Sequence, residues 1–180
     1  YTPIPIGLMI IYFARPGNTH PTFGIPLLLM GEAIRIWAVS YAGGKTRTRT
    51  VGAPALCSSG PFAFVRNPLY LGNMLMYVGI VLIAGSANVW LMVATTVSFF
   101  LIQYSLIISL EEETLTLLFG KEYEEYKRNV PAIFPRISRW DNRDNRRPSN
   151  LIKTLKTEKR TLQNVVFILI LIYLRIQVFY

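Results

Sequence analysis

The sequence predicts an all-α, polytopic membrane protein, a helical bundle with about five transmembrane helices. Three observations lead to this fold class. Hydrophobic residues make up 52% of the 180 residues, and the mean hydropathy is +0.35. The net charge is nevertheless +9, so the charged residues must be segregated from the apolar ones. Several apolar runs also have the length that a hydrocarbon core of roughly 30 Å requires. We expect residues 1–180 to form a single integral membrane domain.

The expected spans follow one another along the chain. Residues 3–13 look like part of a first span, and the sequence leaves open whether that span is complete. Residues 23–41 and 89–110 are each long enough to cross the membrane at about 1.5 Å per residue. Residues 69–84 and 165–180 are shorter but equally apolar, and complete the set.

Residues 69–110 are expected to form an antiparallel helical hairpin around a tight turn at residues 85–88. Small residues allow two membrane helices to approach each other closely. The small residues that predict this contact are Gly72, Gly79 and Ala84 on the first helix and Ala94 and Ser98 on the second.

The distribution of cations orients the spans. Residues 43–66 contain no acidic residue and four cations, Lys45, Arg47, Arg49 and Arg66. Residues 111–162 contain twelve Lys and Arg residues against nine Asp and Glu residues. Because cationic loops are retained on the cytoplasmic side, residues 43–68 and 111–162 are expected to be cytoplasmic. Within the latter, the mixture of apolar and basic residues over 151–162 predicts an interfacial helix before the last span.

The chain contains one cysteine, Cys57, and one histidine, His20. A single cysteine excludes an intrachain disulfide, and we interpret Cys57 as a small interfacial side chain rather than a reactive thiol. With one histidine and no cluster of ligands, we expect no metal centre. We expect no nucleic-acid partner either.

Glu32 and Arg35 are charged residues inside the otherwise apolar 23–41 span. Ionisable side chains at membrane depth usually face a bundle interior or a cavity. Because they are three residues apart, the two share a helical face and would neutralise one another. The sequence leaves open whether they form a structural pair or line a substrate or cofactor cavity. It also leaves open whether Arg35 reaches the cytoplasmic surface.

The run Arg66-Asn67-Pro68-Leu69-Tyr70 opens the third expected span. Proline is well suited to the first turn of a helix, where its missing N–H costs nothing. Asn67 is a suitable cap for the same helix. These structural roles do not account for Arg66 and Tyr70, and free N–H groups at a helix start also suit a ligand carboxylate.

Glu111, Glu112 and Glu113 follow the fourth expected span. If the helix ends there, three carboxylates oppose its dipole, so they are poorly placed for stability. A charge run is most often a solvated face. A cation or a sugar diol bound by Glu111 or Glu112 would instead explain their position.

Together these residues resemble a family of membrane methyltransferases that includes isoprenylcysteine carboxyl methyltransferases and phospholipid N-methyltransferases. The family pattern begins Gly-x-Tyr-x-x-x-Arg-His-Pro-x-Tyr-x-Gly. After a helical hairpin it continues with Glu-Glu-x-x-Leu, then Phe-Gly-x-x-Tyr-x-x-Tyr, then Pro. The chain matches the first part with Gly60, Phe62, Arg66, Asn67, Pro68, Tyr70 and Gly72. It matches the second part with Glu111, Glu112, Leu115, Phe119, Gly120, Tyr123, Tyr126 and Pro131.

The resemblance implies that S-adenosyl-L-methionine (SAM) binds at the cytoplasmic face, without a Rossmann domain. The cofactor-binding residues that it implies are Leu56, Phe62, Asn67, Pro68, Leu69, Tyr70, Glu111 and Glu112. The candidate catalytic residues are Arg66, Tyr70 and Arg35. In-line methyl transfer disperses the positive charge of a sulfonium, so alignment and desolvation should carry the rate more than acid–base chemistry.

Three positions depart from the family pattern. Asn67 replaces a histidine and cannot titrate, and Phe62 replaces a tyrosine and loses a hydroxyl. Ile107 stands where prenylcysteine enzymes have an arginine that receives the substrate. The last departure argues against a prenylcysteine carboxylate as the acceptor.

The sequence therefore predicts a SAM-dependent membrane methyltransferase that acts on a lipophilic acceptor delivered from the bilayer. A carboxylate, an amine and a thiol all remain open as the accepting group. The expected location is a bacterial or archaeal plasma membrane. Two alternatives are a steroid-reductase-like oxidoreductase that uses NAD(P)H and a non-catalytic membrane scaffold.

Overall fold

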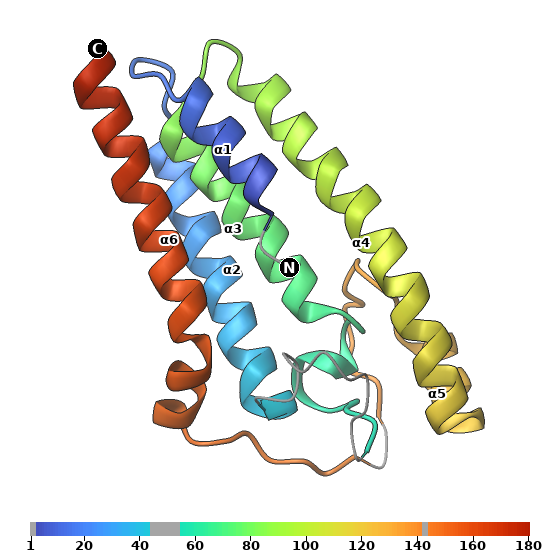
Figure 1. The fold of residues 1–180 in the computed structure, drawn as a ribbon. Helices are drawn as coiled ribbons and strands as arrows, with labels where there is room; N and C mark the ends of the chain where they lie inside the picture. Colours follow the sequence, from blue (N-terminus) through green and yellow to red (C-terminus); the bar gives the residue numbers. More distant parts are fainter. Residues whose placement is uncertain (1–2, 44–54, 142–143) are drawn as a thin grey trace. The chain divides into compact units, whose positions relative to one another are not determined.

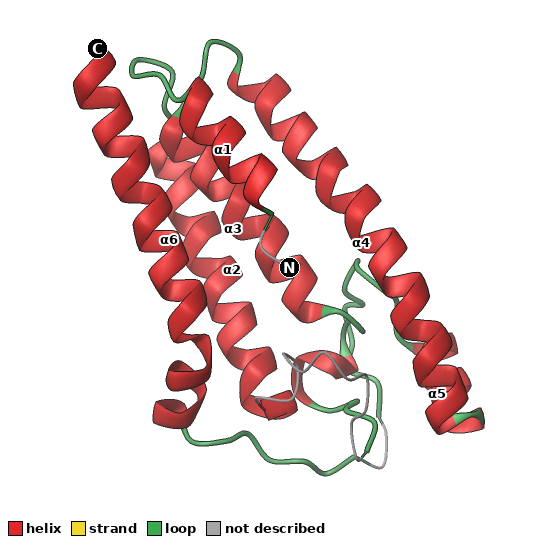
Figure 2. Ribbon diagram, in the orientation of Figure 1, coloured by secondary structure: helices red, strands yellow, loops and turns green. Residues whose placement is uncertain are grey.

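The computed structural model describes residues 3–43, 55–141 and 144–180, and these residues are helical or loop, with no strand (Figure 2). The predicted all-helical class is confirmed. Figure 1 labels the elements, which are α1 (Ile4–Phe13), α2 (Pro21–Ala42), the 3-10 helix η2 (Gly60–Ala63), α3 (Pro68–Ala84), α4 (Val89–Phe119), α5 (Lys121–Asn129) and α6 (Leu151–Phe179). The cations Lys45, Arg47 and Arg49 lie outside the described residues.

Within the described residues, α2, α4 and α6 are long and apolar enough to cross a membrane. Helices α1 and α3 are apolar but shorter. These properties are those of a membrane helical bundle. The number of spans, their exact bounds and their orientation stay predictions.

Two helices differ from their predicted extents. Helix α4 runs on to Phe119, so Glu111, Glu112 and Glu113 lie inside it and not at its C-terminus. The argument that they oppose a helix dipole is therefore wrong, because that effect acts only within the last turn. Helix α6 is continuous from Leu151, so the predicted interfacial helix and the last expected span are one helix.

The chain forms two compact units. The first consists of residues 1–32, 73–102 and 159–180, and the second of residues 33–72 and 103–158. Helices α2, α3, α4 and α6 each contribute residues to both units.

In the first unit, two glycines let α2 and α3 touch backbone to backbone. A Cβ atom added to Gly79 would lie 2.6 Å from the carbonyl oxygen of Gly24, and one added to Gly24 would lie 2.7 Å from that of Gly79. Such close approach is the usual role of small residues in membrane helices. Gly79 thus contacts α2, whereas the sequence predicted that it would face the second helix of the hairpin.

In the second unit, residues 63–67 are hydrogen-bonded to the segment that follows α5. The N–H of Arg66 donates to Pro131 (2.8 Å), that of Asn67 to Ala132 (3.2 Å), and that of Arg136 to Phe64 (3.0 Å). Helix α5 ends at Asn129 because Pro131 cannot continue it. The segment after α5 is therefore hydrogen-bonded to the residues that lead into α3 and holds them in place.

Candidate functional site

The motif Arg66-Asn67-Pro68 is a helix start held in place by its own backbone. Pro68 is the first residue of α3 and is fully buried, as its predicted place in the first turn requires. The carbonyl of Asn67 accepts the N–H groups of Tyr70 (3.1 Å) and Leu71 (3.2 Å). Half-buried Leu69 completes the first turn.

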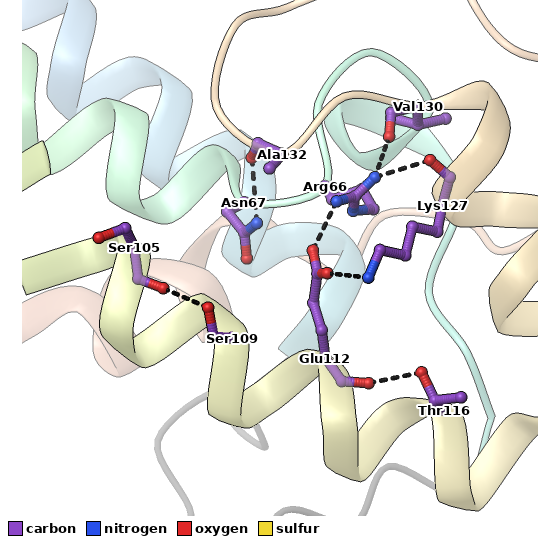
Figure 3. A network of polar contacts seen from close by, with 9 residues as sticks. All are labelled: Arg66, Asn67, Ser105, Ser109, Glu112, Thr116, Lys127, Val130 and Ala132. Carbon is purple, nitrogen blue, oxygen red and sulfur yellow. Dashed lines mark hydrogen bonds and ion pairs between the residues drawn. The ribbon is translucent and has the colours of Figure 1, made fainter. Parts of the chain in front are cut away.

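The side chain of Asn67 is used within the chain. Its amide nitrogen donates to the carbonyl of Ala132 at 3.0 Å (Figure 3). The segment after α5 thus positions both the backbone and the side chain of this residue. Its predicted contact with a cofactor stays a prediction.

Arg66, Glu112 and Lys127 form one ionic network (Figure 3). Glu112 Oε1 lies 2.5 Å from a guanidinium nitrogen of Arg66, and its Oε2 lies 2.6 Å from Lys127 Nζ. Arg66 also donates to the carbonyls of Lys127, in the last turn of α5, and of Val130, directly after that helix. The network ties the start of α3 to α4 and to the end of α5.

Glu111, the neighbour of Glu112, has a different partner. Its Oε1 accepts a hydrogen bond from the hydroxyl of Tyr70 at 2.8 Å. The ring of Tyr70 is stacked on that of Tyr104, with 4.3 Å between the ring centres. Both rings therefore hold the hydroxyl toward Glu111. Within the described ranges, no Lys or Arg side chain forms an ion pair with Glu111.

Leu56 and Phe62, the two predicted cofactor-binding residues that precede Arg66, pack within the second unit. Leu56 is buried in a cluster with Tyr123, Tyr126 and Val130. Phe62 is half-buried, and its carbonyl accepts the hydroxyl of Tyr126 at 2.8 Å. Burial, with the nearby Glu112 carboxylate second, raises the pKa of Tyr123 to about 12, so this phenol is neutral at physiological pH. Tyr123 and Tyr126, three residues apart in α5, are both buried and therefore lie on one face of the helix.

Gly60 allows the loop before Phe62 to pass close to α2. Its φ is +60°, and a Cβ atom there would lie 2.6 Å from the ring of Tyr41. Only glycine meets both requirements without strain. This is a local reason for glycine at the first position of the motif.

Arg35 has a partner that the sequence did not suggest. Its guanidinium lies 2.7 Å from a carboxylate oxygen of Glu158 in α6, and both residues are buried. The pairing of Arg35 with Glu32 stays a prediction, and the ion pair with Glu158 is a contact that it did not include. The only available signal was that Glu158 is a lone acid among Lys153, Lys156, Lys159 and Arg160.

Sequence reasoning also missed Asp144, which lies in the linker between α5 and α6. Its carboxylate accepts the N–H of Ser58 at 2.9 Å, and Arg146 donates to the carbonyl of Leu56 at 3.2 Å. Partial burial raises the pKa of Asp144, but hydrogen bonds from the N–H groups of Ser58 and Arg146 outweigh it and lower the pKa. The linker therefore fixes the loop that carries Leu56.

The second unit also contains a groove of about 390 Å³ between the second half of α2 and the start of α6. Most of the side chains that line it are apolar or small, among them Ala33, Ile36, Trp37 and Leu151. Trp37 also contacts Phe64, with 6.0 Å between ring centres. The groove thus adjoins the segment that leads into Arg66.

Comparison with known proteins matches residues 19–122 to the phospholipid methyltransferase family. This range covers more than half of the chain and contains the start of α3, Glu111 and Glu112. The chain belongs to the phospholipid methyltransferase family. Membership confirms the resemblance that the two motifs predicted.

Curated relatives of this family member fall into two groups. It is 31% identical over 117 residues to the nickel-cobalt-cadmium resistance protein NccN of Alcaligenes xylosoxydans xylosoxydans, a match covering 65% of the chain and 50% of the relative. It is 32% identical over 115 residues to the cobalt-zinc-cadmium resistance protein CzcN of Cupriavidus metallidurans, covering 64% and 47%. It is 27% identical over 125 residues to the protein-S-isoprenylcysteine O-methyltransferase of Schizosaccharomyces pombe, covering 67% and 51%.

The chain spans about half the length of the curated relatives it matches. No solved structure matches the chain.

Proposed function

We propose that this chain carries the cofactor site of an integral membrane methyltransferase that transfers a methyl group from SAM to a lipophilic acceptor. The observation that carries the proposal is the pairing of Tyr70 with Glu111 beside the start of α3. Family membership implies a methyl donor and favours methyl transfer over the reductase and scaffold alternatives. That the donor is SAM is part of the proposal.

The donor set of the second unit fits this cofactor. SAM carries an ammonium group, a carboxylate, a ribose diol and an adenine. Glu111 is a carboxylate without a cationic partner in the described ranges, so it suits the diol or the ammonium. The first turn of α3, at Pro68, Leu69 and Tyr70, suits a carboxylate.

The two glutamates have different proposed roles. Glu112 is already neutralised by Arg66 and Lys127, so it acts as a positioning residue. Arg66 joins Glu112 to the carbonyls that end α5, and we propose a positioning role for it in place of direct catalysis. Tyr70 orients the carboxylate of Glu111, which contacts the cofactor.

The remaining predicted residues shape the site. We propose that Asn67 and Leu69 contact the cofactor at the helix start and that the ring of Phe62 and the side chain of Leu56 contact its adenine. We propose that Arg35 is structural, because it is buried against Glu158.

When bound, SAM supplies an electrophilic methyl group on a sulfonium. The chain contributes alignment and exclusion of water, since the titratable side chains of the motif are held in ion pairs or hydrogen bonds. An acceptor carboxylate needs no base, whereas an amine must lose its proton first. We place the site at the cytoplasmic face of a bacterial or archaeal plasma membrane, with the α2–α6 groove as a path for the acceptor.

The test is calorimetric titration of the detergent-purified protein with S-adenosylhomocysteine. Wild type should bind, and Glu111→Gln should bind roughly tenfold to a hundredfold more weakly, as expected for a lost charged hydrogen bond. The matched control is Glu113→Gln, because Glu113 is the exposed next residue of the same helix. It should bind like wild type.

A folded wild type without measurable binding would contradict the proposed cofactor. Equal weakening by Glu111→Gln and Glu113→Gln would contradict the assignment of Glu111, because it would show a general effect of charge.

A further inference from the structure

Two arginines from distant parts of the chain lie against the same aromatic ring in the first unit. The guanidinium carbon of Arg175, near the end of α6, is 3.7 Å from the centre of the Phe179 ring and 5.8 Å from that of Tyr180. The guanidinium carbon of Arg15, in the loop before α2, is 5.8 Å from the same Tyr180 ring. We call these four residues the arginine patch.

The loop that carries Arg15 is fixed to the α3–α4 turn. The N–H of Arg15 donates to the carbonyl of Ala84 at 3.3 Å, and the amide of Asn18 donates to the carbonyl of Ser86 at 3.1 Å. These hydrogen bonds hold the backbone at Arg15 in place.

The positive charge of the arginine patch has no acidic counterpart nearby in sequence. The three segments that make up the first unit contain a single Asp or Glu residue, Glu32, well inside α2. In the described part of the chain, Nη1 of Arg175 is covered and has no hydrogen-bond partner. Aromatic rings rather than a carboxylate hold this guanidinium.

The first unit also carries exposed aromatic side chains outside the patch. Tyr12, Trp90 and Tyr173 are 69%, 66% and 62% exposed. Such rings concentrate where apolar helices meet lipid headgroups. In the apolar 18-residue window of α6 only 6% of the residues are buried within the chain, so this part of the helix presents a largely exposed apolar surface.

We propose that Arg15 and Arg175 bind the phosphate of an anionic phospholipid headgroup, with Phe179 and Tyr180 beside the upper acyl chain. Two guanidinium groups match the charge and the oxygen geometry of a phosphodiester. A lipid is favoured over free phosphate because the aromatic rings and the exposed apolar face of α6 supply a surface for the rest of the molecule. This site is separate from the proposed cofactor site and does not depend on methyl transfer.

The experiment uses the full chain in detergent, titrated with phosphatidylglycerol and followed by native mass spectrometry. Each arginine near an anionic headgroup adds to the affinity for the lipid. The double variant Arg15→Gln with Arg175→Gln should therefore weaken binding about thirtyfold. Arg15→Gln alone, in an exposed loop, should weaken it about fivefold. The matched control is Lys121→Gln with Arg139→Gln, which removes the same charge from exposed positions outside the patch.

Retention of phosphatidylglycerol by the control pair and its loss from the patch variants would support the site. An equal loss in both pairs would overturn it, because net charge alone would then explain binding. Equal binding of phosphatidylcholine, or displacement by millimolar inorganic phosphate, would overturn the assignment to an anionic lipid.

Discussion

At the scale of single residues, the clearest feature is that adjacent glutamates have separate tasks. Glu112 neutralises Arg66 and Lys127, whereas Glu111 accepts a hydrogen bond from Tyr70. Successive residues on a helix point about 100° apart, so neighbours meet different partners. The sequence motif Glu-Glu could not reveal which glutamate contacts which group, because that depends on where α3 and α5 lie.

Glu112→Ala should destabilise the protein strongly. The side chain of Arg66 is only 9% exposed, so removal of the carboxylate leaves a nearly buried guanidinium without its ion pair. We expect the free energy of unfolding to fall by about 3 kcal/mol, measured by denaturant unfolding in detergent. Glu113→Ala is the control and should change it by about 0.5 kcal/mol or less. Equal effects of the two substitutions would show that the network contributes little.

Cys57 should be slow to react with thiol reagents. Burial, which outweighs the attraction of Arg146, raises the pKa of its thiol from 9.0 to about 11. Because the thiolate is the reactive species, alkylation at pH 8 should be about a hundredfold slower than for an exposed cysteine. The rate should rise about tenfold per pH unit until the pH approaches the pKa. Rapid alkylation of the folded protein at pH 8 would contradict this burial.

At the scale of helices, local sequence signals predicted a helix start but not the full length of a helix or its long-range contacts. Pro68 correctly predicted the start of α3. The extent of α4 was missed because Glu111 to Glu113 look like the end of a span, although a helix continues beyond the hydrocarbon core without difficulty. The partner of Arg35 was missed because Glu158 is 123 residues away, and no local periodicity carries such a contact.

The substitution Arg35→Leu should therefore lower the free energy of unfolding more than the removal of an exposed charge does. Glu158 has a fully buried side chain, and the substitution removes its guanidinium partner. We expect a loss of roughly 3–5 kcal/mol in the free energy of unfolding. The double variant Arg35→Leu with Glu158→Leu should recover most of that loss, because neither charge of the pair is then left buried without the other. Thermal and denaturant unfolding of the three proteins measure the coupling, and additive losses would show that the two side chains act independently.

At the scale of the whole molecule, composition and hydropathy were enough to predict a helical membrane protein, and the paired motifs were enough to predict its family. The division into two units was not predicted, because α2, α3, α4 and α6 each pass through both and no linker marks a boundary. Nor was the pairing of residues 63–67 with the segment after α5, which rests on backbone hydrogen bonds that any residue types can make. The start of α3 is therefore shaped by a partner segment that carries no motif of its own.

Binding of S-adenosylhomocysteine should stabilise the second unit selectively. The proposed ligand contacts lie at the start of α3 and at Glu111, and the loop before α3 is hydrogen-bonded to Pro131, Ala132 and Arg136. Because a ligand that binds only the folded state opposes local opening, hydrogen exchange should slow in residues 55–67 and 131–140. The internal control is the pair of loops at residues 14–20 and 85–88, which belong to the first unit and should exchange as before. Equal protection of both sets of loops, measured by hydrogen-exchange mass spectrometry, would show that binding tightens the whole chain, and protection of the control loops alone would place the ligand elsewhere.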